Sequence, residues 1–282
     1  MLGSFYITQV RGVPIRLHFT ALLLLPWFNR IVQGLGLPQS WVMPVTLTFI
    51  LFLLVSVALH ELGHTLVAQR YHIHVQDIVL TPIGGVARMV GSLENPNHEI
   101  RVALAGPYVS LALSGAGWLL SLLFYNLDWM VPGAFSRIFA YLNLMLFAFN
   151  LLPSFPMDGG RVLRGWLAQR KGMMEATRIA SALGRMIAIG FVVIGLSTDR
   201  INLAIIGGFI FMAAGSEYRM MKLKTWQEQT FGIGAAGLQP PQVEVSPPPY
   251  AASSTPAIKG FPADLVATAR DLVEEILGKS PA

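Results

Sequence analysis

Two histidines and a glutamate lie within five residues of one another in the apolar stretch "LFLLVSVALHELGHTLVAQR". His60 and His64 are four positions apart, so on a helix both imidazoles share one face and can reach a single ion. Glu61 lies beside them on the same surface, where its carboxylate can take a proton from a bound water. The pattern His-Glu-x-x-His is typical of helices that hold zinc. Zinc in such a site would lower the pKa of water to about 7, which provides a nucleophile at neutral pH.

The apolar surroundings of these three residues favour a functional interpretation. An ionisable side chain inside a membrane span costs about 3 kcal/mol or more and usually marks a functional site. The alternative is a buried cluster that only hydrogen-bonds neighbouring helices. The chain has no cysteine, so any further metal ligand must be His, Asp or Glu.

Asp158 is the candidate for the third ligand. It lies in "NLLPSFPMDGGRVLRGW", directly after an apolar segment that ends at Pro153 and Pro156. Gly159 and Gly160 would let the chain turn, so the carboxylate could lean toward the two histidines. Irregular backbone at membrane depth is tolerated where it lines a protein-enclosed or wet cavity. The alternative is that Asp158 only caps a helix starting at Gly159, and the two roles are compatible.

Membrane-spanning helices are the elements that must position these residues. Apolar residues make up 54% of the 282-residue chain and charged residues only 12%, whereas soluble domains are roughly a quarter charged. A span needs about 20 apolar residues. We therefore predict an all-α polytopic membrane protein with about six transmembrane helices, over residues 17–37, 41–68, 101–125, 136–152, 179–197 and 201–215.

Basic residues indicate how these spans are oriented. They gather before the first span, between the second and third, between the fourth and fifth, and after the sixth. Segments of this kind lie on the cytoplasmic side of a membrane. We therefore predict a multi-pass protein of the plasma membrane with both termini in the cytoplasm. Because the net charge of +5 fits loop topology, we expect no nucleic-acid partner.

The composition changes after residue 230. Residues 231–258 are rich in Pro, Gly, Ala and Ser, which predicts a flexible linker after a membrane domain over 1–230. In residues 259–282 the apolar side chains share one helical face, opposite acidic ones. This pattern predicts a short amphipathic helix that docks on its own chain or on a partner, and a weakly ordered tail is the alternative.

Taken together, "HELGH" and "NLLPSFPMDGGR" resemble the motifs of the site-2 protease family, which are intramembrane zinc metalloproteases. The segments "TPIGGVARM" and "EIRVALAGPYVSLAL" are similar to that family as well, and the resemblance covers roughly residues 5–225. The form it resembles is the compact six-span one, because nothing between the second and fourth spans is long enough for an inserted PDZ domain.

The resemblance implies a role for each matching position. One zinc ion per chain would be held by His60, His64 and Asp158. Glu61 would be the general base and then the proton donor to the leaving amine. Asn150 would orient the substrate or stabilise the oxyanion, although an interhelical hydrogen bond accounts for it almost as well.

The resemblance also implies a short strand or re-entrant loop between the second and third spans, over residues 81–89. Its backbone could pair with an unwound segment of a transmembrane substrate, as an edge strand does. Gly84 and Gly85 would allow close backbone approach, although a plain turn accounts for them too. We include Pro153 with them as a candidate substrate-binding residue.

These features predict an intramembrane zinc endopeptidase that cuts a transmembrane protein or peptide substrate within the lipid bilayer, near the cytoplasmic face. One alternative is a metal transporter or channel that uses the same ligands. It would need polar groups in the outer halves of the spans, and residues 41–55 are almost wholly apolar. Another alternative is an inactive relative that binds transmembrane partners, but such a scaffold has no need of Glu61.

Overall fold

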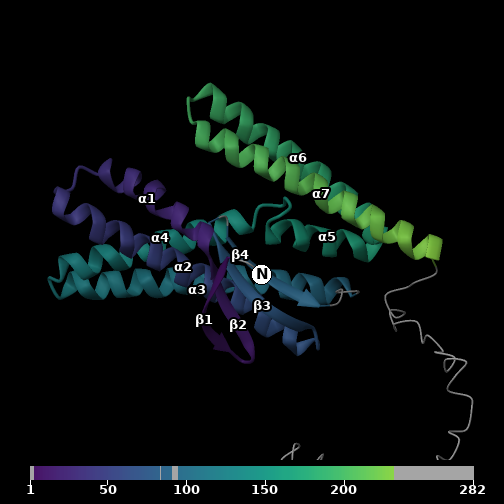
Figure 1. Ribbon diagram of the computed structural model, residues 1–282, viewed down its shortest axis with the longest axis horizontal. Coiled ribbons are helices and arrows are strands. Elements are labelled where there is room, and N and C mark those ends of the chain that lie inside the picture. The colour runs from purple at the N-terminus through teal and green to yellow at the C-terminus, as the bar shows by residue number, and fades with distance from the viewer. Residues whose placement is uncertain (1–2, 83, 91–94, 232–282) are drawn as a thin grey trace, which may run out of the picture. The chain divides into compact units, whose positions relative to one another are not determined.

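The computed structural model describes residues 3–82, 84–90 and 95–231, and helices dominate them (Figure 1). By length and composition, five helices in the described part of the chain could cross a membrane. The all-helical polytopic class is therefore confirmed, with a small sheet added near the N-terminus. The five helices are α2 (Gln39–Arg70), α3 (Pro96–Asn126), α4 (Met130–Asn150), α6 (Met173–Ser197) and α7 (Ile201–Phe231).

The first predicted span differs from the expectation. Residues 17–37 contain the end of a strand, a 3-10 helix η1 (Phe19–Leu23) and the helix α1 (Leu24–Gln33). A ten-residue helix is only about 15 Å long, half the thickness of a bilayer's hydrocarbon core. Gly34 caps α1 after those ten residues. The segment is apolar but is not one long helix, and it is not among the candidate membrane spans of the described residues.

A four-stranded sheet accompanies the helices, in the order β1 (Ser4–Val10), β2 (Val13–His18), β3 (His74–Thr81) and β4 (Gly84–Val90). β1 and β4 pair antiparallel with their neighbours, whereas β2 and β3 are parallel. The parallel pairing requires a long crossover, which α2 supplies. The predicted strand over residues 81–89 is thus β4, the edge of a larger sheet. The two N-terminal strands were not predicted.

The sheet packs against the half of α2 that carries the histidines. Val57 and Ala68 of α2 share a buried apolar cluster with residues of β2, β3 and α3. Burial of this face fixes the register of the strands, because a shift by one residue would turn their apolar side chains outward. The members from the sheet and α3 are Val13, Ile15, Val75, Ile78, Leu80 and Val102.

A buried ion pair ties the edge strand to the sheet. Asp77 of β3 is 2% exposed and accepts hydrogen bonds from the guanidinium of Arg88 on β4. The Nε atom of Arg16, on β2, lies 3.7 Å from the same carboxylate. The hydrogen bonds from Arg88 hold the pKa of Asp77 below its ordinary value. The carboxylate therefore stays charged at neutral pH and holds β4 in place.

The helices pack as neighbours in a defined order. α3 contacts α2, α4 and α5 (Asp158–Lys171), and α5 contacts α6. α6 and α7 lie side by side as a hairpin (Figure 1). The sixth predicted span was marginal at 201–215, and α7 in fact continues well beyond it. The predicted linker and C-terminal helix lie outside the described residues, except for Phe231 at the end of α7.

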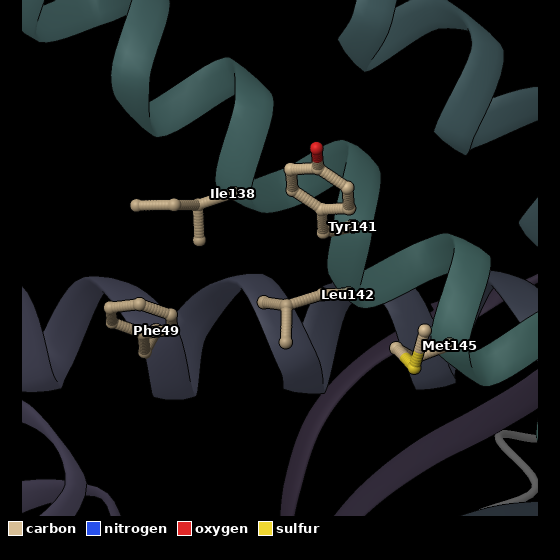
Figure 2. A pocket seen from close by; sticks show the side chains of 5 residues that line it. All are labelled: Phe49, Ile138, Tyr141, Leu142 and Met145. Atoms are coloured by element: carbon tan, nitrogen blue, oxygen red, sulfur yellow. The ribbon is translucent and has the colours of Figure 1, made fainter.

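Figure 2 shows a pocket between α2 and α4 that is apolar. Phe49 from α2 faces Ile138, Leu142 and Met145 from α4, and the hydroxyl of Tyr141 points away from Phe49. Apart from that hydroxyl, the lining offers carbon and a thioether sulfur. This pocket therefore has no carboxylate or imidazole ligand for a metal ion.

Candidate metal centre

The two histidines of α2 present their Nε2 atoms to one point. These atoms of His60 and His64 lie 3.1 Å apart, and both residues are 3% exposed. The Nδ1 atom of His64 donates to the carbonyl oxygen of Val102, 2.7 Å away. The Nδ1 atom of His60 lies 2.8 Å from Oγ of Ser110, which can accept its proton. With Nδ1 so engaged, each Nε2 keeps its lone pair for a metal.

Asp158 completes the cluster from α5. Its Oδ2 atom lies 3.1 Å from Nε2 of both His60 and His64. The three side chains are buried and form the one group of potential metal ligands found among the described residues. Ligands placed tetrahedrally about 2.0–2.1 Å from zinc lie roughly 3.3 Å from each other, so the observed separations fit. Two imidazoles and a carboxylate are also a donor set that zinc accepts.

The start of α5 is what brings Asp158 to the histidines. Asp158 is the first residue of α5, and the N-cap is Met157, which makes no side-chain cap. Asp158 is therefore not the N-cap of a helix that starts at Gly159, which was the predicted alternative. Gly159 and Gly160 lie in the first helical turn, where a Cβ would collide with the backbone of the preceding loop. They are needed for close packing, and the positive end of the helix dipole favours the charged carboxylate.

α3 supplies the floor of the cluster. Val102, Gly106 and Ser110 are spaced by four residues and so lie on one face of that helix. A Cβ at Gly106 would lie 2.6 Å from Nε2 of His60 and nearer still to that of His64. Sequence reasoning missed these three residues. The available signal was the spacing of Gly106 and Ser110, a small and a polar residue four positions apart in an apolar span, whereas Val102 acts through its backbone carbonyl and gives no such signal.

Replacing Gly106 by Ala is expected to weaken zinc binding on the order of a hundredfold, because its methyl group would occupy the space in front of both Nε2 atoms. Competition with a chromophoric zinc chelator would measure this affinity. Gly115→Ala on the same helix is the matched control, since nothing lies within 4 Å of a Cβ there. Equal zinc affinity in the two variants would contradict the assigned ligand point.

Glu61 lies between the cluster and the edge strand. A Cβ on Gly85 of β4 would lie 3.0 Å from Oε1 of Glu61 and 2.9 Å from its Cδ. Only a glycine therefore lets the strand backbone pass so close to this carboxylate. Gly84 begins β4, and its carbonyl oxygen accepts a hydrogen bond of 2.7 Å from the hydroxyl of Thr81. β4 has β3 on one side and no strand on its other side among the described residues.

Asn150 and Pro153 are less closely tied to the cluster. Asn150 ends α4 and donates through Nδ2 to the carbonyl oxygen of Leu146, 2.9 Å away, within its own helix. The described hydrogen bond of the Asn150 amide is therefore within α4, and not the interhelical bond that was the predicted alternative. Pro153 lies in the loop between α4 and α5. Among the described contacts, none joins these two residues to His60, His64 or Asp158.

Comparison with known proteins agrees with this arrangement. The model of peptidase family M50 matches residues 48–136 and 127–195. A zinc metalloprotease of Methanocaldococcus jannaschii is 36% identical over 223 residues, which are 79% of this chain and 62% of that protein. Stage IV sporulation protein FB of Bacillus subtilis is 27% identical over 202 residues, or 68% of each chain.

A solved structure is similar as well. The site-2 protease from Methanocaldococcus jannaschii matches with a TM-score of 0.58 and 34% identity, covering 76% of this chain and 95% of that one. The five candidate spans of the described residues and the cluster of two imidazoles and a carboxylate agree with this likeness. The chain belongs to peptidase family M50, the family of the site-2 proteases.

Proposed function

We propose that this chain is a zinc-dependent endopeptidase that cleaves a peptide bond in or near a transmembrane segment of a membrane-protein substrate. The observation that carries the proposal is the convergence of His60, His64 and Asp158, 3.1 Å apart, beside Glu61. These three residues would hold the zinc ion. When bound, zinc supplies activation of a water molecule and polarisation of the scissile carbonyl.

The side chain of Glu61 would move the protons of the reaction. As a carboxylate it accepts a proton from the attacking water, and it then donates that proton to the nitrogen of the leaving amine. This requires that it not be a metal ligand, and its carboxyl is not one of the three grouped donors. Asn150 has a second N–H that could orient the substrate or stabilise the oxyanion.

The edge of β4 would bind the substrate backbone. A peptide bond inside a helix is shielded by its own hydrogen bonds, so the substrate segment must unwind before attack. An unwound segment could pair with the free edge of β4 as an added strand. Gly84 and Gly85 would let it approach Glu61, and Pro153 would shape the loop on the Asp158 side.

The membrane setting follows from the same family. The five candidate spans support contact with a lipid bilayer, and the plasma membrane remains our prediction. Both termini lie in the cytoplasm only if the number of crossings is even. Because there are five long helices among the described residues, that prediction requires a sixth crossing, for which the segment of η1 and α1 is our candidate.

The proposal can be tested with the purified chain. It would be reconstituted with membranes from a host strain that lacks the gene for this protein. New protein N-termini, identified by mass spectrometry, are expected in or next to transmembrane segments. They should disappear with a zinc chelator and return when zinc is added back. Cuts confined to water-soluble regions would contradict the substrate class, and zinc flux into proteoliposomes without any cleavage would favour the transporter.

A further inference from the structure

Arg164 of α5 and Glu99 of α3 form an ion pair outside the metal centre. Glu99 is 2% exposed and the side chain of Arg164 is 15% exposed. The Nε atom of Arg164 donates to Oε1 of Glu99 at 2.9 Å, and its Nη2 donates to the same oxygen. The guanidinium also lies 5.1 Å from the ring centroid of Phe155. The arginine thus joins α3, α5 and the loop that precedes Asp158.

The neighbouring residue brings the two helices into close contact. A Cβ on Gly165 would lie 2.7 Å from Cγ1 of Ile100 and 3.0 Å from the carbonyl oxygen of Pro96. The first turns of α3 and the middle of α5 therefore lie closer together than a side chain at position 165 would permit. This close contact sets the distance between the two helices, and the buried ion pair with its fixed geometry adds a specific restraint on their register.

α3 is also the helix that orients both histidines. Its Val102 carbonyl and Ser110 hydroxyl contact the Nδ1 atoms, one and three turns beyond Glu99. Asp158 is the first residue of α5, so its position depends on how α5 packs on its neighbours. The contact of α5 with α3 is therefore one of the restraints that bring the carboxylate to the imidazoles.

We propose that Arg164 is a positioning residue, whose pairing with Glu99 locks α5 on α3 so that Asp158 meets the two histidines of α2. The proposal rests on the proposed zinc site. It assigns no direct contact with zinc or substrate to either residue. Oε2 of Glu99 has no hydrogen-bond partner among the described residues. Its other oxygen, Oε1, therefore accepts both hydrogen bonds from Arg164.

Glu99→Gln in the full-length chain tests the lock, because it keeps the shape of the side chain and removes its charge. Zinc affinity is expected to fall about 10–100-fold, as for other residues that orient metal ligands. The absorption spectrum of the cobalt(II) form should change with it. Arg164→Lys keeps the charge and loses the planar fork, so its affinity should lie between those of wild type and Arg164→Gln.

Glu217→Gln is the matched control at the same arginine. Its carboxylate lies 3.6 Å from Nη1 of Arg164 but its side chain is 44% exposed. An exposed ion pair contributes little, so zinc affinity should be unchanged. If Glu217→Gln weakens zinc binding as much as Glu99→Gln, the buried pair is not the lock.

A measurement on the metal-free protein separates position from affinity. The chain has no cysteine, so spin labels can be placed at Tyr108→Cys on α3 and Arg170→Cys on α5, both exposed positions. Glu99→Gln should broaden the distribution of the distance between these labels, and Glu217→Gln should not. An unchanged distribution in folded Glu99→Gln would overturn the proposal.

A double variant covers the case in which a lone buried charge prevents folding. Glu99→Met with Arg164→Met removes both charges and is expected to fold, yet to bind zinc about 10–100-fold more weakly. Wild-type zinc affinity in that variant would also overturn the proposal. Failure of the wild-type chain itself to bind zinc would instead refute the proposed function.

Discussion

Replacing Glu61 by Gln is expected to lower the cleavage rate on the order of 10²–10⁴-fold while zinc stays bound. Glutamine has the same shape, but its amide cannot accept the proton of the attacking water. The three grouped donor atoms come from other residues, so the metal should remain. The rate is measured as kcat/KM on a substrate identified by the reconstitution described above, and bound zinc by elemental analysis.

Glu175→Gln provides the matched control for that substitution. It makes the same chemical change at Glu175 of α6, whose side chain is 45% exposed. Among the described ion pairs, Glu175 takes part only in the one with Arg178. Its kcat/KM should equal that of wild type. Full activity of Glu61→Gln would mean that the base lies elsewhere, and loss of its zinc would mean that Glu61 serves as a ligand.

Replacing Asp158 by Ala is expected to weaken zinc binding by more than about a hundredfold and to abolish cleavage with it. The substitution removes the donor that lies 3.1 Å from both imidazoles. The metal-free protein should also lose about 1–3 kcal/mol of stability, because the buried carboxylate lies within hydrogen-bond distance of both imidazoles. Zinc affinity by chelator competition and the thermal unfolding of metal-free protein would separate these two effects.

Gln169→Ala, at an exposed position near the end of the same helix, serves as its control. It removes an exposed hydrogen bond to Asn97 of α3, which contributes less to the contact of α5 with α3 than the buried ion pair does, so zinc affinity should not change. If Asp158→Ala retained the zinc affinity of Gln169→Ala, the third ligand would have to be another residue.

The three candidate metal ligands could be predicted because the sequence features that indicate them are local or follow from the order of the spans. His60 and His64 follow from helical spacing, and Asp158 follows from the shared membrane face of two span ends. The N-terminal strands could not be predicted in the same way. β2 pairs with β3 across a stretch of sequence that includes the whole of α2, and β1 is placed only through its pairing with β2. In addition, an apolar segment such as 17–37 has the composition of a span.

The partners of the predicted residues were beyond reach for a different reason. Which atom meets Nδ1 of each histidine depends on the rotation of α3 about its axis. Whether Arg164 meets Glu99 depends on how far α5 slides along α3. Both are decided by side-chain packing between helices distant in sequence, as at Gly165 against Ile100.

The central claim is that His60, His64 and Asp158 bind the same zinc ion. X-ray absorption at the zinc edge, on full-length chain loaded with one equivalent, tests it most directly. We expect two imidazole nitrogens and light oxygen ligands at about 2.0–2.2 Å. His64→Ala should remove one imidazole from the spectrum, and Asp158→Ala an oxygen. A zinc spectrum that stays the same in both variants would contradict the claim.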